Sequence, residues 1–218
     1  LAQINRSDAE TPKIREVIVK IYEGQETVQR MQILRAMQHL YDPGLQPFLL
    51  GVAKAPEEEL PDIRVIALNA YAMLANKAES ATAKVFITGD KSPYKGTFES
   101  QNATLLKVGA ECDEAVACWT KKLDDKDENV VRKAAYMLAR VGRNKPDVIK
   151  ALVSKLDHPK ELVRGDVLSA RDYVAISGSP EAVAKIEALR KAEEGRGSWS
   201  HIKDRALATQ AKLAARGK

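Results

Sequence analysis

A basic residue recurs along the chain at a nearly constant interval, and no other residue set combines chemical type and spacing so clearly. The gaps between successive members are 34, 68, 32 and 39 residues, and 68 is twice 34. If each member holds the same place in a repeated unit, stacking of the units would align the cations along one groove that could bind an anion. This set, called here the basic ladder, consists of Arg30, Arg64, Arg132, Arg164 and Lys203.

The only two cysteines, Cys112 and Cys118, lie six residues apart. On one continuous helix this separation corresponds to about 9 Å of rise, whereas the Cα atoms of a disulfide lie within about 7 Å of each other. A break between Gly109 and Asp113 would fold the chain back and allow the bond. We expect a structural disulfide, with two reduced core thiols as the alternative. A redox pair normally uses Cys-x-x-Cys spacing, and a zinc site needs more ligands.

Other residue types that carry catalysis or bind metals show no useful spacing. The three histidines, His39, His158 and His201, are isolated, and neither His-Glu-x-x-His nor Gly-x-Ser-x-Gly occurs. The segment Thr88–Ser92 resembles a phosphate-binding loop in composition but lacks the upstream glycine spacing. We therefore expect no catalytic, metal-binding or cofactor-binding residues, and a protein that is not an enzyme.

The elements that must position the ladder are amphipathic helices. Val131, Ala134, Ala135 and Leu138 follow the 0, 3, 4, 7 spacing of one helical stripe, and Gly142 follows as a stop. A shorter amphipathic stretch and a polar turn precede this stripe. Each unit is thus a helix, a turn and a second helix. Because one such pair cannot bury both of its faces, successive pairs must stack.

The second helices share a motif of Val or Ile, then Arg, then apolar residues three and six positions after the Arg. This motif resembles the HEAT-repeat family over most of the chain. The resemblance implies one all-α domain over residues 1–218, built as a right-handed α-solenoid of about five HEAT-like helix pairs. The clearest copies are Ile63-Arg64 with Ala67 and Ala70, Val131-Arg132 with Ala135 and Leu138, and Val163-Arg164 with Val167 and Ala170.

The same resemblance implies a structural role for the ladder, because in HEAT-like repeats such an arginine ties the turn between the paired helices. The candidate acidic partners are Asp62, Asp127 and Asp157. A structural role competes with the anion-binding role, and we favour the structural one. The aspartate that often ends the first helix of a HEAT repeat is present only as Asp124 and Asp157.

Two features depart from the repeat pattern. Asp166 stands where other units have Ile66 and Ala134, so either its helix is rotated to let the carboxylate reach water or an arginine, or it is a buried acid at a binding site. Residues 76–110 break the period and contain many turn-forming residues, which indicates an irregular insertion or a degenerate repeat. Loops of this kind are often binding sites and often simple insertions.

Composition and charge narrow the classes of function. No apolar run approaches the roughly 18 residues of a membrane span, and 30% of the residues are charged. Residues 120–218 hold 22 Lys and Arg against 14 Asp and Glu, while residues 1–119 hold 13 against 16. A basic C-terminal half suits an anionic partner, although interspersed Lys and Glu can simply solvate helix faces.

These observations favour a monomeric, non-enzymatic scaffold that binds another protein through the concave surface of its second helices. The alternative is a nucleic-acid-binding protein similar to the HEAT-like DNA glycosylases, using the basic C-terminal half. Against it, Trp119 and Trp199 are the only tryptophans, and binding of bases usually needs aromatic stacking platforms. The expected disulfide and the start at Leu1 point to an extracytoplasmic bacterial protein, periplasmic or secreted, with the cytoplasm as the alternative.

Overall fold

The computed structural model describes residues 8–55, 61–89, 97–174, 179–196 and 201–216. Within these ranges every regular element is helical. The chain is an all-α helical repeat protein, as predicted. Its contacts gather into two units, Leu1–Ala115 and Val116–Lys218.

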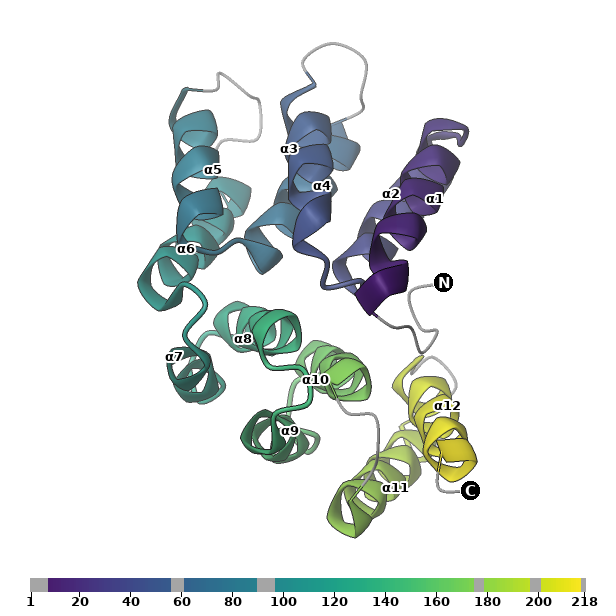
Figure 1. Cartoon of the computed structure of the whole chain (residues 1–218). Coiled ribbons are helices and arrows are strands. Elements are labelled where there is room, and N and C mark those ends of the chain that lie inside the picture. Colours follow the sequence, from purple (N-terminus) through teal and green to yellow (C-terminus); the bar gives the residue numbers. More distant parts are fainter. Residues whose placement is uncertain (1–7, 56–60, 90–96, 175–178, 197–200, 217–218) are drawn as a thin grey trace. The chain divides into compact units, whose positions relative to one another are not determined.

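The N-terminal unit consists of three helix pairs (Figure 1). The second helix of each pair packs against the second helix of the next, so that α2, α4 and α6 form one layer. Two short 3-10 turns, η1 (Asp8–Glu10) and η2 (Pro43–Leu45), precede α1 and α3. The pairs are α1 (Thr11–Glu23) with α2 (Thr27–Gln38), α3 (Gln46–Lys54) with α4 (Pro61–Leu74), and α5 (Lys77–Gly89) with α6 (Thr97–Cys112).

The C-terminal unit, coloured from teal to yellow in Figure 1, repeats this arrangement with α8, α10 and α12 as the layer of second helices. Six pairs are therefore present in the described residues, where about five were expected. The additional pair is α5 with α6. The C-terminal pairs are α7 (Val116–Lys122) with α8 (Glu128–Val141), α9 (Pro146–Val153) with α10 (Glu161–Val174), and α11 (Pro180–Glu194) with α12 (His201–Arg216).

The segment 76–110, expected to be an irregular insertion or a degenerate repeat, is mostly helical. Helix α5 ends at Gly89 and α6 begins at Thr97, and the two helices pack against each other. The turn-forming residues that suggested a long loop are concentrated between these two ends, and residues 90–96 lie outside the described part. A helix pair here also accounts for the doubled gap in the ladder.

Helix α8 shows how the sequence sets the ends of a second helix. The Asp127 carboxylate accepts a hydrogen bond of 2.9 Å from the backbone N–H of Asn129, which satisfies one of the free donors of the first turn. At the other end, Gly142 lies against α9. A Cβ at this position would lie 2.6 Å from the carbonyl oxygen of Leu138 and 2.8 Å from the methyl groups of Val148. Only glycine fits this close approach.

The expected apolar stripe of α8 is buried, but so is most of the rest of the helix, because α7 and α10 pack on it from different sides. Trp119 of α7 has no exposed surface, and the Nζ atom of Lys133 lies 5.7 Å from the centroid of its indole ring. Lys133 is itself fully buried, so the cation–π contact stabilises an ammonium group away from water. None of the helices in the described ranges is long and apolar enough to cross a membrane.

Candidate binding face on the second helices of the C-terminal unit

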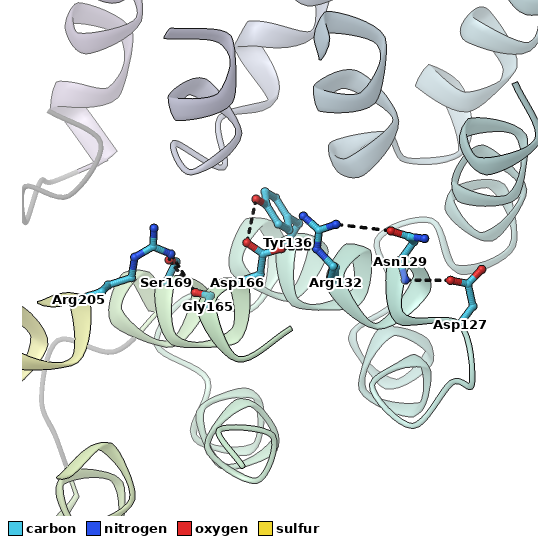
Figure 2. Close-up of polar contacts among 8 residues, drawn as sticks. All are labelled: Asp127, Asn129, Arg132, Tyr136, Gly165, Asp166, Ser169 and Arg205. Atoms are coloured by element: carbon cyan, nitrogen blue, oxygen red, sulfur yellow. Dashed lines mark hydrogen bonds and ion pairs between the residues drawn. The ribbon is translucent and has the colours of Figure 1, made fainter. Parts of the chain in front are cut away.

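An ion pair between two neighbouring second helices is the centre of the candidate site. The Nε atom of Arg132 on α8 donates a hydrogen bond of 2.7 Å to Oδ2 of Asp166 on α10. The hydroxyl group of Tyr136, one turn further along α8, donates to the other carboxylate oxygen at 3.3 Å. Arg132 also reaches Oδ1 of Asn129 at 3.5 Å, which places Asn129 at the edge of the site (Figure 2). Both oxygens of this largely buried carboxylate are thus occupied.

The next pair of second helices is joined by a related contact. The Nη1 atom of Arg205 on α12 donates to the carbonyl oxygen of Gly165 at 3.0 Å and to the hydroxyl oxygen of Ser169 at 2.6 Å, both on α10. Figure 2 shows these contacts and the Arg132–Asp166 pair along the same row of helices. We call this set the polar row, and it consists of Arg132, Tyr136, Asp166, Ser169 and Arg205.

Electrostatics keep Arg132 in its charged form. Burial of Arg132 disfavours its cationic state, but the nearby charge of Asp166 and the hydrogen bond to it more than compensate. The net effect is that the pKa of Arg132 is raised above its ordinary value. Arg132 is therefore a fixed cation whose guanidinium plane is oriented by a carboxylate on the neighbouring helix.

The structure answers the question raised by Asp166. Its carboxylate reaches an arginine, which is the first of the two interpretations considered from the sequence. Arg132 was expected to pair with an aspartate of its own turn, but its partner belongs to the following repeat. Asp127 instead caps α8 through Asn129. The side chain of Asp62 lies outside the described part, and Asp157 is exposed.

Arg164 is the ladder member that ties a turn. Its Nη1 atom donates to the carbonyl oxygens of His158 and Pro159, each at 2.9 Å, in the turn between α9 and α10. Its Nε and Nη2 atoms bind Oε1 of Glu193 at 2.8 and 2.6 Å. Glu193 lies on α11 of the next pair, is 1% exposed, and also accepts from Arg196 at 2.6 Å. Arg164 thus links its own turn to the following repeat.

The remaining ladder members make contacts of three further kinds. Arg64 donates through Nε to the carbonyl oxygen of Ala53 at the end of α3, at 3.1 Å. The Cζ atom of Arg30 lies 5.2 Å from the centroid of the Tyr22 ring. Lys203 is half-exposed and lies 3.9 Å from Glu194. The five cations therefore meet partners of different kinds.

A hollow of about 440 Å³ lies between two inter-helix turns of this unit. It carries charges of both signs, and Lys160 and Glu128 form an ion pair of 3.5 Å at its edge. Partial burial and the positive charge of Lys155 lower the pKa of His158 below its ordinary value. The hollow is lined by Asp125, Lys126, Asp127, Glu128, His158, Pro159 and Lys160. Across the described residues, no group of three or more His, Cys, Asp and Glu could hold a metal ion.

The two cysteines lie at disulfide-bonding distance. The break in the helix that allows this comes directly after Cys112, at the end of the stretch from Gly109 to Asp113 in which the sequence predicted it. Helix α6 continues through Gly109 to Cys112, and Asp113 then adopts a left-handed φ of 49°. The N–H of Ala115 bonds back to the carbonyl oxygen of Cys112 at 2.9 Å. This tight turn brings Cys112 near Cys118.

Sequence reasoning singled out Arg132 and Asp166 but missed Tyr136 and Ser169. It did not connect Arg205 with these residues. A usable signal was present, because Asp166 and Arg205 each stand two residues after a ladder member. Two polar residues at the same repeat position, on second helices that pack together, indicate a shared polar surface.

Comparisons with known proteins agree on little beyond helical repeats. No family model and no curated protein matches the chain. A designed armadillo repeat protein, YIII(Dq)4CqI, is similar with 20% sequence identity and a TM-score of 0.38, covering 97% of each chain. Another, YIII(Dq.V1)4CPAF in complex with the peptide (KR)4, shows 17% identity and a TM-score of 0.39, covering 97% of this chain and 96% of that one.

Proposed function

We propose that this protein is a non-enzymatic scaffold that binds an extended segment of another protein across α8, α10 and α12. The observation that carries the proposal is the polar row. Three second helices that pack side by side present partly exposed polar groups, and hydrogen bonds between the helices already fix their orientation. A face that is ordered before binding loses little conformational freedom on association, which favours binding.

We infer that the repeats are of the HEAT type. The support is that each repeat contains two helices, as in HEAT repeats, whereas armadillo repeats contain three. The Val-Arg or Ile-Arg motif at the start of α4, α8 and α10 is further support. Stacked pairs of this kind expose a continuous layer of second helices, and such layers serve as extended binding surfaces in repeat proteins.

The experiment is selection of random peptides of about ten residues, which in extended form reach across three packed helices. Selected peptides are then tested against Ser169→Trp, which places a large ring in the middle of the polar row. Ser154→Trp is the matched control, because Ser154 is exposed at the end of α9. We expect the first variant to weaken binding at least about tenfold and the control to leave it unchanged. Failure to select any peptide, or equal binding by both variants, would refute the proposal.

A further inference from the structure

We infer that the segment bound across α8, α10 and α12 is acidic, and that it places carboxylates against Arg205 and Arg132. This inference rests on the proposed function and adds the chemistry of the partner. It follows from the hydrogen bonds of the polar row, in which the two guanidinium groups have unused N–H donors while the oxygens of Asp166 and Ser169 each already accept a hydrogen bond.

The acceptors of the row are occupied within the protein. Asp166 accepts from Arg132 at one oxygen and from Tyr136 at the other. The Ser169 hydroxyl accepts from Arg205 and donates to the carbonyl oxygen of Gly165 at 3.0 Å. A ligand that brought only donors, such as a lysine-rich segment, would meet two arginines and acceptor oxygens that already have hydrogen-bond partners.

The donors are only partly used. A guanidinium group has five N–H donors in a fixed fork. Arg205 uses Nη1, and within residues 116–174, 179–196 and 201–216 no partner lies at its Nε or Nη2 atoms. Arg132 uses Nε and Nη1, and in the same ranges its Nη2 atom has no partner. The free Nε and Nη2 edge of Arg205 has the geometry that binds a carboxylate through two parallel hydrogen bonds.

The charge of the surrounding helices agrees. The second helices α8, α10 and α12 together carry nine Lys and Arg against five Asp and Glu. The first helices α7, α9 and α11 carry six against five. Three of the nine, Lys133, Arg164 and Arg171, are buried, so an approaching acidic segment would meet the partly exposed side chains, Arg132 and Arg205 among them.

An acidic protein segment fits this face better than a single-stranded nucleic acid does. Helices α8, α10 and α12 contain no Phe or Trp, and their two tyrosines offer little ring surface: Tyr136 is 1% exposed, and Tyr173 is half-buried beneath Arg143, whose Cζ atom lies 4.9 Å from the ring centroid. Nucleic-acid-binding surfaces for single strands rely on stacking on aromatic side chains.

The spacing of the two arginines sets the spacing of the acids. Arg132 and Arg205 lie on α8 and α12, with α10 between them. Neighbouring helix axes are about 8–10 Å apart, so the two sites are separated by about 16–20 Å. An extended chain covers about 3.3–3.6 Å per residue, so two carboxylates about five or six residues apart would reach both sites.

The test uses fluorescently labelled peptides in which two glutamates about five residues apart are separated by Gly and Ser. Matched peptides carry Gln or Lys in place of both glutamates, and a labelled DNA duplex is a further probe. Binding is measured by fluorescence anisotropy at low and at physiological salt. We expect the glutamate peptide to bind at least about tenfold more tightly than the Gln peptide, with a preference that weakens as salt rises.

Protein variants locate the contact. Arg205→Gln should lower the affinity for the glutamate peptide at least about tenfold. Arg205→Lys, which keeps the charge, should lower it less. Lys150→Gln, an exposed site on α9, removes the same charge away from the row and should have no effect. Because Arg205 also holds the carbonyl of Gly165, circular dichroism melting of each variant is measured. If Arg205→Gln is unfolded, the comparison of peptides on the unaltered protein decides.

Equal binding of the Glu and Gln peptides, or preference for the Lys peptide, would overturn the inference. The inference would also be overturned if the DNA duplex bound more tightly than the glutamate peptide and competed with it. The proposed function would survive these results if selected peptides without acidic residues still bind the row and are blocked by Ser169→Trp. Failure of selection itself would refute both.

Discussion

Arg132 on α8 and Asp166 on α10 are 34 residues apart in sequence and joined by a 2.7 Å hydrogen bond between Nε and Oδ2. The bond connects two repeats, while the turn of the Arg132 repeat is held separately by Asp127. A residue that looks like an internal brace of one repeat is therefore part of the connection between repeats. It is also part of the face proposed to bind a partner.

Arg132→Met should lower the free energy of unfolding by about 1–3 kcal/mol, because it leaves the carboxylate of Asp166 largely buried without its counter-ion. The double variant Arg132→Met with Asp166→Leu should recover most of the loss, since neither charge is then left alone. Urea denaturation of both variants measures the effect. Equal losses in the single and double variants would show that the ion pair is not the cause.

Glu193→Gln should lower the free energy of unfolding by about 3 kcal/mol, since it removes the charge that compensates buried Arg164. Glu194→Gln is the matched control on the adjacent residue. Glu194 is 41% exposed, so its loss should cost less than about 1 kcal/mol. Thermal melting of the two variants side by side makes the comparison, and similar melting temperatures would contradict the prediction.

Gly142→Ala should destabilise the protein by about 1–3 kcal/mol, because the added methyl group has no room beside Leu138 and Val148. Gly51→Ala is the control, since nothing lies within 4 Å of a Cβ placed there on α3. That variant should instead stabilise by about 0.5–1 kcal/mol, because alanine favours a helix interior over glycine. A stabilising effect of Gly142→Ala would refute the close approach.

The pKa of His158 is lowered by burial and by Lys155, so the folded protein binds a proton there less readily than the unfolded chain does. Stability must therefore fall as the pH drops below the unfolded-state value of about 6.5. Between pH 7 and pH 5 the unaltered protein should lose more stability than His158→Gln does. His201→Gln, at an exposed position of α12, is the control and should follow the unaltered protein. Identical pH profiles for all three proteins would contradict this prediction.

Cys112 and Cys118 should take up no thiol-alkylating label when the freshly purified protein is denatured without reductant. After reduction each should take up one label. The reason is that the turn at Asp113–Ala115 places the two sulfur atoms within bonding distance. Intact-mass spectrometry gives the number of labels directly. Two labels before reduction would disprove the disulfide and remove the argument for an extracytoplasmic location.

The sequence predicts the helix pairs well, because their stripes, caps and stops are local. The stripe around Val131 and the stop at Gly142 agree with α8 as the structure has it. The contacts between repeats are less predictable, since the partner of Arg132 lies one full repeat away and depends on how the helices stack. For segment 76–110 the sequence left an irregular insertion and a degenerate repeat as alternatives, because glycine, proline and serine are frequent between the stretches that form α5 and α6.

The charges at one repeat position also restrict how the array could have been rearranged by duplication or deletion. Asp166 and Arg205 stand two residues after successive members of the ladder, and the first accepts the guanidinium of Arg132. Removal of the pair α9 and α10 would bring α8 against α12 and set Arg132 opposite Arg205. Two like charges would then meet at a partly buried junction. The order of the pairs that contain α8, α10 and α12 is therefore constrained at this junction, where Arg132 requires an acidic residue on the helix that follows.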